Sequence, residues 1–451
     1  MPFATPFSMP FQRAGGEPSL VADTRAMARL RLYALTFIAF ILFSQIGPDP
    51  FADQSVSLVR SSGDLIKQAV LILLCALLLF EGWDSQILRA NLALPVSLLI
   101  LLGYCLLSVA WAIDPAISIR RLGLTALTMW FMYRAVGLLG YAYTLESLRV
   151  ALAVILVVNF AMVLLSEHGI HHLEIGDNDS VVGAWRGILS HKNIAGPISA
   201  VTAIVFLFDW RNQDSMLRYL VVVLAAVFLG FTQSKTAMLA LAVAVAAGVV
   251  LPVLAARSRS FRVFALVLLV VGAVQVFSIF AGDFITSLDD PTAFTGRASI
   301  WHVLVEYAQA HLWTGAGFGS FWQIGNASPV WDYDTGWVAR QAAGGHNAYL
   351  DLLVTIGLPG LLLTVVTMFL LPTARLWLSN DMAQSKRGLI LALIFFVLVN
   401  NMAESQLLDR TSFDQEILVM ALAFIADDSI VASVQKRLKT WFAAIRQGAA
   451  V

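Results

Sequence analysis

The stretch Thr236–Ala255, TAMLALAVAVAAGVVLPVLA, runs for 20 residues without a charged side chain. An α-helix needs about 20 mostly apolar residues to cross the hydrocarbon core of a bilayer. The rest of the chain is similar, because 59% of its 451 residues are hydrophobic and only 13% are charged. Soluble domains carry about 25% charged residues. The sequence therefore predicts an all-α, polytopic integral membrane protein.

Twelve segments of the chain are apolar enough to be spanning helices. They are 30–47, 65–81, 92–112, 122–140, 148–166, 194–210, 217–233, 236–255, 263–281, 357–373, 388–404 and 413–428. This pattern divides the chain into a cytoplasmic tail at 1–29, spans one to nine within 30–281, a long loop at 282–356, spans ten to twelve within 357–428, and a second cytoplasmic tail at 429–451.

The distribution of lysine and arginine predicts the orientation. With a cytoplasmic N-terminus, 19 of the 29 basic residues fall at the cytoplasmic ends of the spans, as the positive-inside rule requires. Both termini are then cytoplasmic, and the long loop lies on the outer face. Ten cations oppose the rule: Arg60, Lys67, Arg120, Arg121, Arg186, Lys192, Lys235, Arg297, Arg340 and Arg410.

The remaining composition argues against several kinds of site. The net charge is zero, so bulk electrostatics gives no reason to expect a nucleic-acid partner. Cys75 and Cys105 lie in apolar runs, which favours buried thiols over a disulfide or a metal site. His171 and His172 have no spaced third ligand, which argues against a metal site there. Asp332-Tyr333-Asp334 has the DxD pattern of metal-dependent sugar transferases, but no strand pattern precedes it. No metal and no cofactor are expected.

Most of the outer cations sit in short polar motifs at helix ends, near one predicted depth. The motifs are SVAWAIDPAISIRR (108–121), AWRGILSHKNIAG (184–196), TQSKTA (232–237), TGRASIW (295–301) and GGHNAY (344–349). Ionisable residues at membrane depth mark functional sites, and grouped Arg, Lys and His would bind a phosphate or pyrophosphate. Alternatives stay open, since Arg120 and Lys235 could simply snorkel, and Asn193 and Asn347 could be helix caps.

His346 is the strongest candidate for a general base. Its imidazole titrates near neutral pH, and Gly344 and Gly345 before it allow an unusual turn or a close backbone approach. It is also the first residue of a predicted helix at 346–356, and a helix N-terminus favours the neutral ring. The alternative is a histidine that only caps or hydrogen-bonds.

The long loop carries an expected helix of its own. In Ser299–Ala310 the apolar residues Ile300, Val303, Leu304 and Tyr307 repeat at helical spacing, which predicts an amphipathic helix along the membrane interface. Five tryptophans crowd the loop and fit either an interfacial belt or stacking against sugar rings. The belt is favoured for Trp301 and Trp313, and the others are Trp322, Trp331 and Trp337.

The motifs TGRASIW, HLWTGAGFGSFW and GGHNAYLDLLVTIGLPG, in this order, resemble the O-antigen ligase and Wzy-type polysaccharide polymerase superfamily. SVAWAIDPAISIRR and LSHKNIAG are similar to motifs of its exopolysaccharide polymerase branch, and NNMAESQLLDR also fits. The resemblance covers about residues 100–410. It implies an inverting glycosyltransferase, without metal or cofactor, at the periplasmic face of the bacterial inner membrane. It would move or polymerise a glycan from a polyprenyl-diphosphate-linked donor.

The resemblance also implies roles for individual residues. His346 would be the base and Arg297 a diphosphate ligand, and the other donor-binding candidates are Arg186, His191, Lys192, Lys235, and Arg120 or Arg121. Supporting candidates in the same motifs are Gly296, Gly345, Asn347 and Tyr349. Expected partners are the lipid-linked donor, a glycan or glycolipid acceptor, membrane lipid, and chain-length and export proteins.

Two alternatives to a polymerase follow from the same residues. A ligase would use the lipid A core as acceptor, although the HKN and SKT motifs favour the polymerase. A transporter or flippase of lipid-linked sugars would use the basic pocket only for binding. Such a transporter would have broken helices, polar residues at the midplane and paired repeats, and the sequence has few midplane charges and no repeat.

Overall fold

The computed structural model describes residues 20–48, 65–80, 94–172, 181–208, 215–258, 260–264, 297–378 and 382–427. Its secondary structure is helical, apart from one isolated β-bridge between Ile170 and Trp185 in these residues. The predicted all-helical fold is confirmed. Within the described residues, four helical segments are long and apolar enough to cross a membrane, namely Met27–Ile46, Pro115–Leu165, Lys235–Ala255 and Ala348–Leu378. Shorter apolar helices are Leu65–Leu79, Val96–Trp111, Lys192–Leu207 and Met216–Thr232.

Helices stand at most of the predicted spans. They are α1 (Leu20–Ile46), α2 (Leu65–Phe80), α4 (Val96–Ser108) with η2 (Val109–Trp111), α5 (Pro115–Leu165), α6 (Lys192–Leu207), α7 (Ser215–Thr232), α8 (Lys235–Ala255), α15 (Gln384–Asn400) and a final helix at 413–427. The predicted span 263–281 lies outside the described residues beyond residue 264. The total of twelve spans therefore stays a prediction.

Helix α5 contains two of the predicted spans, 122–140 and 148–166. It starts at Pro115, and the Asp114 side chain caps it by accepting from the Ile117 N–H at 2.9 Å. A proline at the first helical position loses no hydrogen bond that the helix would otherwise make. Gly140 interrupts the helix with φ 69° and ψ 170°, a conformation open to glycine. The two spans thus follow each other with a break at Gly140 and no separate loop.

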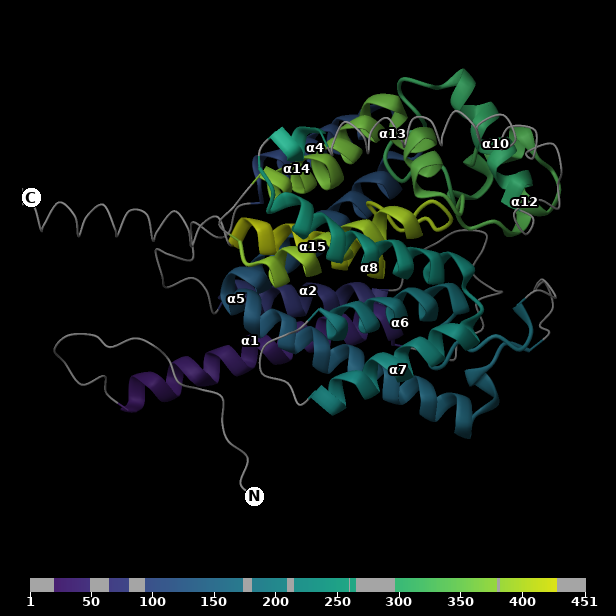
Figure 1. The fold of residues 1–451 in the computed structure, drawn as a ribbon. Coiled ribbons are helices and arrows are strands. Elements are labelled where there is room, and N and C mark those ends of the chain that lie inside the picture. The colour runs from purple at the N-terminus through teal and green to yellow at the C-terminus, as the bar shows by residue number, and fades with distance from the viewer. Residues whose placement is uncertain are drawn as a thin grey trace, which may run out of the picture.

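Long helices pack side by side in a bundle (Figure 1), with α15 against α8, α6 against α7 and α1 against α5. Glycines bring α8 and α15 close together, because a side chain at Gly248 would collide with the carbonyl of Gly388. Small residues allow such close approach in membrane helices. Cys75 on α2 and Cys105 on α4 are free and buried, as predicted.

The elements between residue 297 and the start of α13 gather at one end of the bundle (Figure 1). They are α10 (Arg297–Ala310), η6 (Gly325–Ala327), α11 (Val330–Tyr333), α12 (Trp337–Gln341) and the start of α13 (Ala348–Val365). The apolar face predicted for α10 is confirmed, since Ile300, Val303, Leu304 and Tyr307 are buried. They pack in a cluster with Phe321 and Trp322. This face therefore builds the core of the loop.

Trp301 corrects one prediction. An interfacial belt was favoured for this residue, but its side chain is buried and its Nε1 donates to the carbonyl of Gly345 at 2.8 Å. It holds the segment before α13 in place. Trp313, in contrast, is 66% exposed.

Helix α13 is broken at Gly357 and continues through η7 (Val366–Leu370) into α14 (Leu371–Leu378). Gly357 has φ 69°, and a side chain there would collide with the backbone of Trp313. The loop docks on both sides of the break, because the Ala316 N–H donates to Val354 and the Leu358 N–H donates to Leu312. The break thus fixes the loop against the end of the bundle.

Candidate functional site

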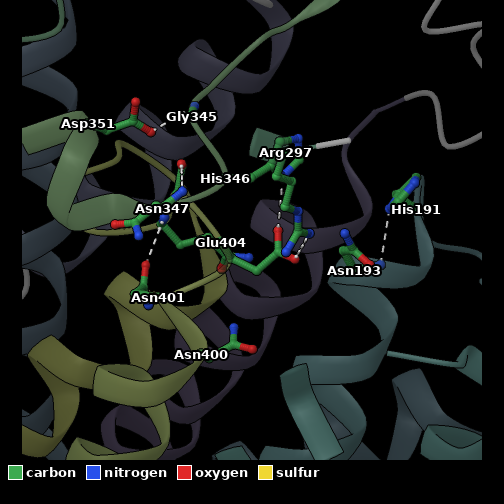
Figure 2. A network of polar contacts seen from close by, with 12 residues as sticks. His191, Asn193, Arg297, Gly345, His346, Asn347, Asp351, Asn400, Asn401 and Glu404 are labelled. Carbon is green, nitrogen blue, oxygen red and sulfur yellow. Dashed lines mark hydrogen bonds and ion pairs between the residues drawn. The ribbon is translucent and has the colours of Figure 1, made fainter. Parts of the chain in front are cut away.

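Three chain segments meet at the carboxylate of Glu404 (Figure 2). Arg297 is the first residue of α10, His346 lies just before α13, and Glu404 lies in the turn after α15. Nη2 of Arg297 donates to Oε1 of Glu404 at 3.0 Å, and Nδ1 of His346 lies 3.6 Å from Oε2. One carboxylate therefore joins the predicted base to the predicted phosphate ligand.

The backbone at His346 has an unusual conformation. Its φ is +48°, a left-handed value that non-glycine residues adopt rarely and that is found at ligand sites. Asn347 follows as the N-cap of α13, because its Oδ1 accepts from the N–H groups of Tyr349 and Leu350, both at 3.1 Å. The helix cap that was one interpretation of Asn347 is thus present, whereas α6 is capped by His191 and not by Asn193. This geometry presents the imidazole, whose side chain is 42% exposed, at the end of the helix.

The two neighbours of His346 are tied to the turn after α15 and to α13. The N–H of Asn347 donates to Oγ of Ser405 at 3.1 Å, and the N–H of Gly345 donates to Oδ2 of Asp351 at 3.0 Å. Trp322 donates to the other oxygen of Asp351 at 2.7 Å. A side chain at Gly345 would collide with Asp351 and Leu304. The close backbone approach predicted for this glycine is thus present.

His191 reaches the same region from the N-terminus of α6 (Figure 2), and Lys192 follows it as the first residue of this helix. The charges of Arg297, Lys235 and Glu404 all act on the Lys192 ammonium. His191 interacts electrostatically with Glu404 and His346. The structure therefore gathers His191 and Lys192 of the LSHKNIAG motif, Arg297 and His346 around one carboxylate.

Burial keeps His191 and His171 neutral. It lowers the pKa of each to about 4; His171 further lowers the pKa of His191, and Arg186 and Lys192 further lower that of His171. The rings lie 5.0 Å apart in an edge-to-face arrangement. Nδ1 of His191 accepts from the Asn193 N–H at 3.1 Å, so the ring proton is on Nε2. That Nε2–H is a donor for an anion.

Two further predicted cations stand at the border of this group. Nε of Arg186 donates to the carbonyl of His168 at 2.8 Å, and its charge acts on His171. Lys235 is the first residue of α8 and interacts with Lys192. Arg186 is therefore connected to the group through His171, and Lys235 through Lys192.

The two adjacent arginines of α5 differ in their surroundings. Arg121 is buried, and its Nη1 donates to the carbonyls of Gly319 and Trp322. It lines a cavity of about 240 Å³ that also borders Gly344 and Ser405. Arg120 is half-buried and does not line this cavity. Of the pair, Arg121 is the one that borders this cavity.

The other supporting candidates have different positions. The hydroxyl of Tyr349 donates to the carbonyl of Leu398 at 2.7 Å, which ties α13 to α15. Gly296 lies outside the described residues. Within the described part of the chain, no group of three or more His, Cys, Asp or Glu side chains is arranged to hold a metal.

The sequence motifs do not identify Glu404 or Asp351 as site residues. Glu404 lies in the NNMAESQLLDR motif, and the available signal was its position directly after an apolar span, beside the predicted group of cations. An acidic side chain there needs a positive partner. Asp351 lies one helical turn after Asn347, is half-buried, and is held by hydrogen bonds from Trp322, Ser405 and the Gly345 N–H.

Residues 220–365 match the family model for O-antigen ligase. This match covers less than half of the chain and supports its resemblance to the O-antigen ligase and Wzy-type polymerase superfamily. The matched segment contains the TGR and GGHN motifs with their predicted base and arginine. The search of curated proteins found no match to this chain. The match and the apolar helices support a multi-pass bacterial membrane protein of the ligase or polymerase type of glycosyltransferase, a family that implies lipid-linked glycan substrates in general.

Proposed function

We propose that the protein is a metal-independent inverting glycosyltransferase that polymerises a polyprenyl-diphosphate-linked glycan at the periplasmic face of the inner membrane. The observation that carries the proposal is the carboxylate of Glu404 between Arg297 and His346. It puts a phosphate ligand and a proton acceptor within one small site. The polar motifs around them supply further positive charge.

The cations of the site would bind the donor's diphosphate. Arg297 uses Nη2 for Glu404, which fixes the guanidinium and leaves its other nitrogens for phosphate oxygens. Lys192 adds a positive charge, and Nε2–H of His191 adds a neutral donor. When the bond from the anomeric carbon to the diphosphate oxygen breaks, its electron pair passes to the diphosphate. Preorganised donors stabilise that charge, and one such donor contributes about 3 kcal/mol of barrier reduction.

His346 would act on the acceptor. With Nδ1 toward Glu404, the ring's Nε2 can accept the proton of a sugar hydroxyl as its oxygen bonds to the anomeric carbon. Glu404 then stabilises the imidazolium. A single displacement from the face opposite the diphosphate inverts the configuration. General-base help of this kind contributes about 100- to 10,000-fold.

The acceptor decides the biological role of this reaction. For a polymerase it is a sugar of another lipid-linked repeat unit, which the HKN and SKT motifs favour, and chain-length and export proteins are then expected partners. For a ligase it is the lipid A core. Glycan analysis of a deletion strain separates them: loss of long polymer with intact lipopolysaccharide supports the polymerase, whereas uncapped lipid A core supports the ligase.

The test of the activity uses the full chain in nanodiscs with lipid-linked repeat units extracted from its own cells. Replacing His346 by Ala should abolish product while the donor accumulates unreacted. Replacing His302, which is exposed and pairs with Glu306, should leave product formation unchanged. Normal product from His346→Ala would contradict the proposal and favour a transporter, because transport does not need a base.

A further inference from the structure

We infer that the long loop holds a binding groove for a saccharide chain, which positions the acceptor glycan for His346. This inference rests on the proposed function. A second cavity, of about 260 Å³, lies beside Trp331 and Arg340. Trp322 and Gln323 line both this cavity and the one that borders Gly344. The two cavities are therefore adjacent, and together they extend from the neighbours of His346 into the loop.

The lining has the composition expected for a sugar site. Trp331 is 39% exposed, and its Nε1–H is directed at the carbonyl of Gly325 at 3.4 Å. The ring is thus oriented while part of its surface stays accessible. A broad indole face suits the apolar side of a sugar ring. A lipid tail would need a lining without the charge and amides found here.

Polar side chains of the same cavity have hydrogen-bonding capacity to spare. Gln323, Asn326 and Arg340 all line it, and the structure gives their side chains no hydrogen bond to another described residue. An amide both donates and accepts, as a sugar hydroxyl does, and a guanidinium adds several donors. A few such groups beside an aromatic ring are typical of small-molecule sites.

Gln323 has a strained backbone where the two cavities meet. Its φ is +56°, and such values in non-glycine residues persist where the surroundings hold them, often at ligand sites. The adjacent Trp322 is fixed by its bond to Asp351, and its carbonyl accepts from Arg121. The junction of the groove is thus held by the same contacts that hold the segment before His346.

The position of the groove assigns it to the acceptor. In Figure 2, His346 and Glu404 lie between Asp351, which lines the first cavity, and His191, which belongs to the proposed diphosphate site. A displacement with inversion requires the acceptor to approach from the side opposite the leaving group. The groove is on that side, so an acceptor chain lying in it would present its terminal sugar to His346.

The experiment measures two ligands separately by calorimetry on the full chain in nanodiscs. One probe is the water-soluble oligosaccharide released by mild acid from the cell's own lipid-linked repeat units, and the other is inorganic pyrophosphate. Trp331→Ala and Arg340→Ala should each weaken oligosaccharide binding by about tenfold, the effect of removing a well-used contact. Both should leave pyrophosphate affinity unchanged. Trp313→Ala is the matched control, since this exposed tryptophan of the same loop lines neither cavity.

Two results would contradict the proposal that the groove binds a saccharide chain. One is a wild-type chain that does not bind the oligosaccharide, and the other is unchanged binding in both variants. Failure of pyrophosphate to bind, with oligosaccharide binding intact and sensitive to Trp331, would instead count against the proposed diphosphate site and leave the groove supported. The two proposals thus fail by different measurements.

Discussion

Nδ1 of His346 lies 3.6 Å from Oε2 of Glu404, whose other oxygen accepts from Arg297 at 3.0 Å. The side chains of Arg297 and Glu404 are only 17% and 9% exposed. This pair is therefore mostly shielded from water, where a carboxylate and a guanidinium interact strongly and where the loss of one leaves the other poorly compensated. Glu404 holds both proposed functional groups at once.

Replacing Glu404 by Ala should destabilise the protein by about 3 kcal/mol, because it leaves Arg297 with an uncompensated charge. Activity should fall as well, since both Arg297 and His346 lose their orientation. Thermal unfolding and glycan synthesis by the chain in nanodiscs measure the two effects. Adding Arg297→Ala to Glu404→Ala should recover stability without recovering activity.

The matched control is the exposed pair of His302 and Glu306, whose atoms lie 3.9 Å apart and whose side chains are 64% and 54% exposed. Such surface pairs contribute about 0–1 kcal/mol, so Glu306→Ala should change neither measurement. Equal effects of Glu306→Ala and Glu404→Ala would show that Glu404 has no special role.

Gly345 should tolerate no side chain, while its neighbour Gly344 should. A Cβ at Gly345 would collide with the Asp351 carboxylate and with Leu304, whereas the same atom at Gly344 meets only ordinary contacts. Gly345→Ala should therefore cost about 1–3 kcal/mol, as overpacking usually does, and displace His346. Activity and thermal unfolding of the two variants, measured side by side, check this. A Gly345→Ala variant as active as Gly344→Ala would contradict the arrangement.

Local features of this fold could be predicted from the sequence. The buried face of α10 follows from apolar residues at helical spacing, and the cap at Asn347 follows from an Asn before an apolar run. Both depend on residues within a few positions of each other. Charged motifs at helix ends also indicated which residues would gather, because each was unusual for the outer side of a membrane helix.

Features that depend on distant pairing could not be predicted in the same way. Arg297 and Glu404 are 107 residues apart, and their contact requires α10 and the turn after α15 to pack at the same end of the bundle. Trp301 was assigned to a membrane belt because composition does not distinguish an interfacial indole from one that donates to Gly345. The two predicted spans 122–140 and 148–166 likewise form one helix, α5, which has a break at Gly140 and no loop between the spans.

Arg121 and Arg120 should behave differently when replaced by Ala. Arg121 donates to two carbonyls of the loop, at Gly319 and Trp322, from a buried position. Removing it leaves those carbonyls without their charged donor, at a cost of about 1.5–3 kcal/mol. Limited proteolysis should then cut the 311–342 segment faster, and glycan synthesis should fall. Arg120→Ala is the control, and the protease should cut its 311–342 segment no faster than that of the wild type.

The two neutral histidines, His171 and His191, should make the free energy of unfolding depend on pH. Burial lowers the pKa of His171 and of His191 to about 4, whereas an unfolded histidine titrates near 6.5. Between about pH 6.5 and 4 the unfolded chain therefore binds more protons than the folded chain, and stability falls as the pH falls through this window. Above it, both states hold neutral rings and the effect disappears. The Tm of the chain in nanodiscs, measured from pH 7.5 to 4.5, should decrease accordingly.

His191→Asn keeps an acceptor for the cap of α6 but removes one titrating ring, so its Tm should fall less steeply over the same range. His302→Asn, which changes an exposed ring, should follow the wild type. If His191→Asn shows the same slope as the wild type, the protons that destabilise the folded chain bind elsewhere.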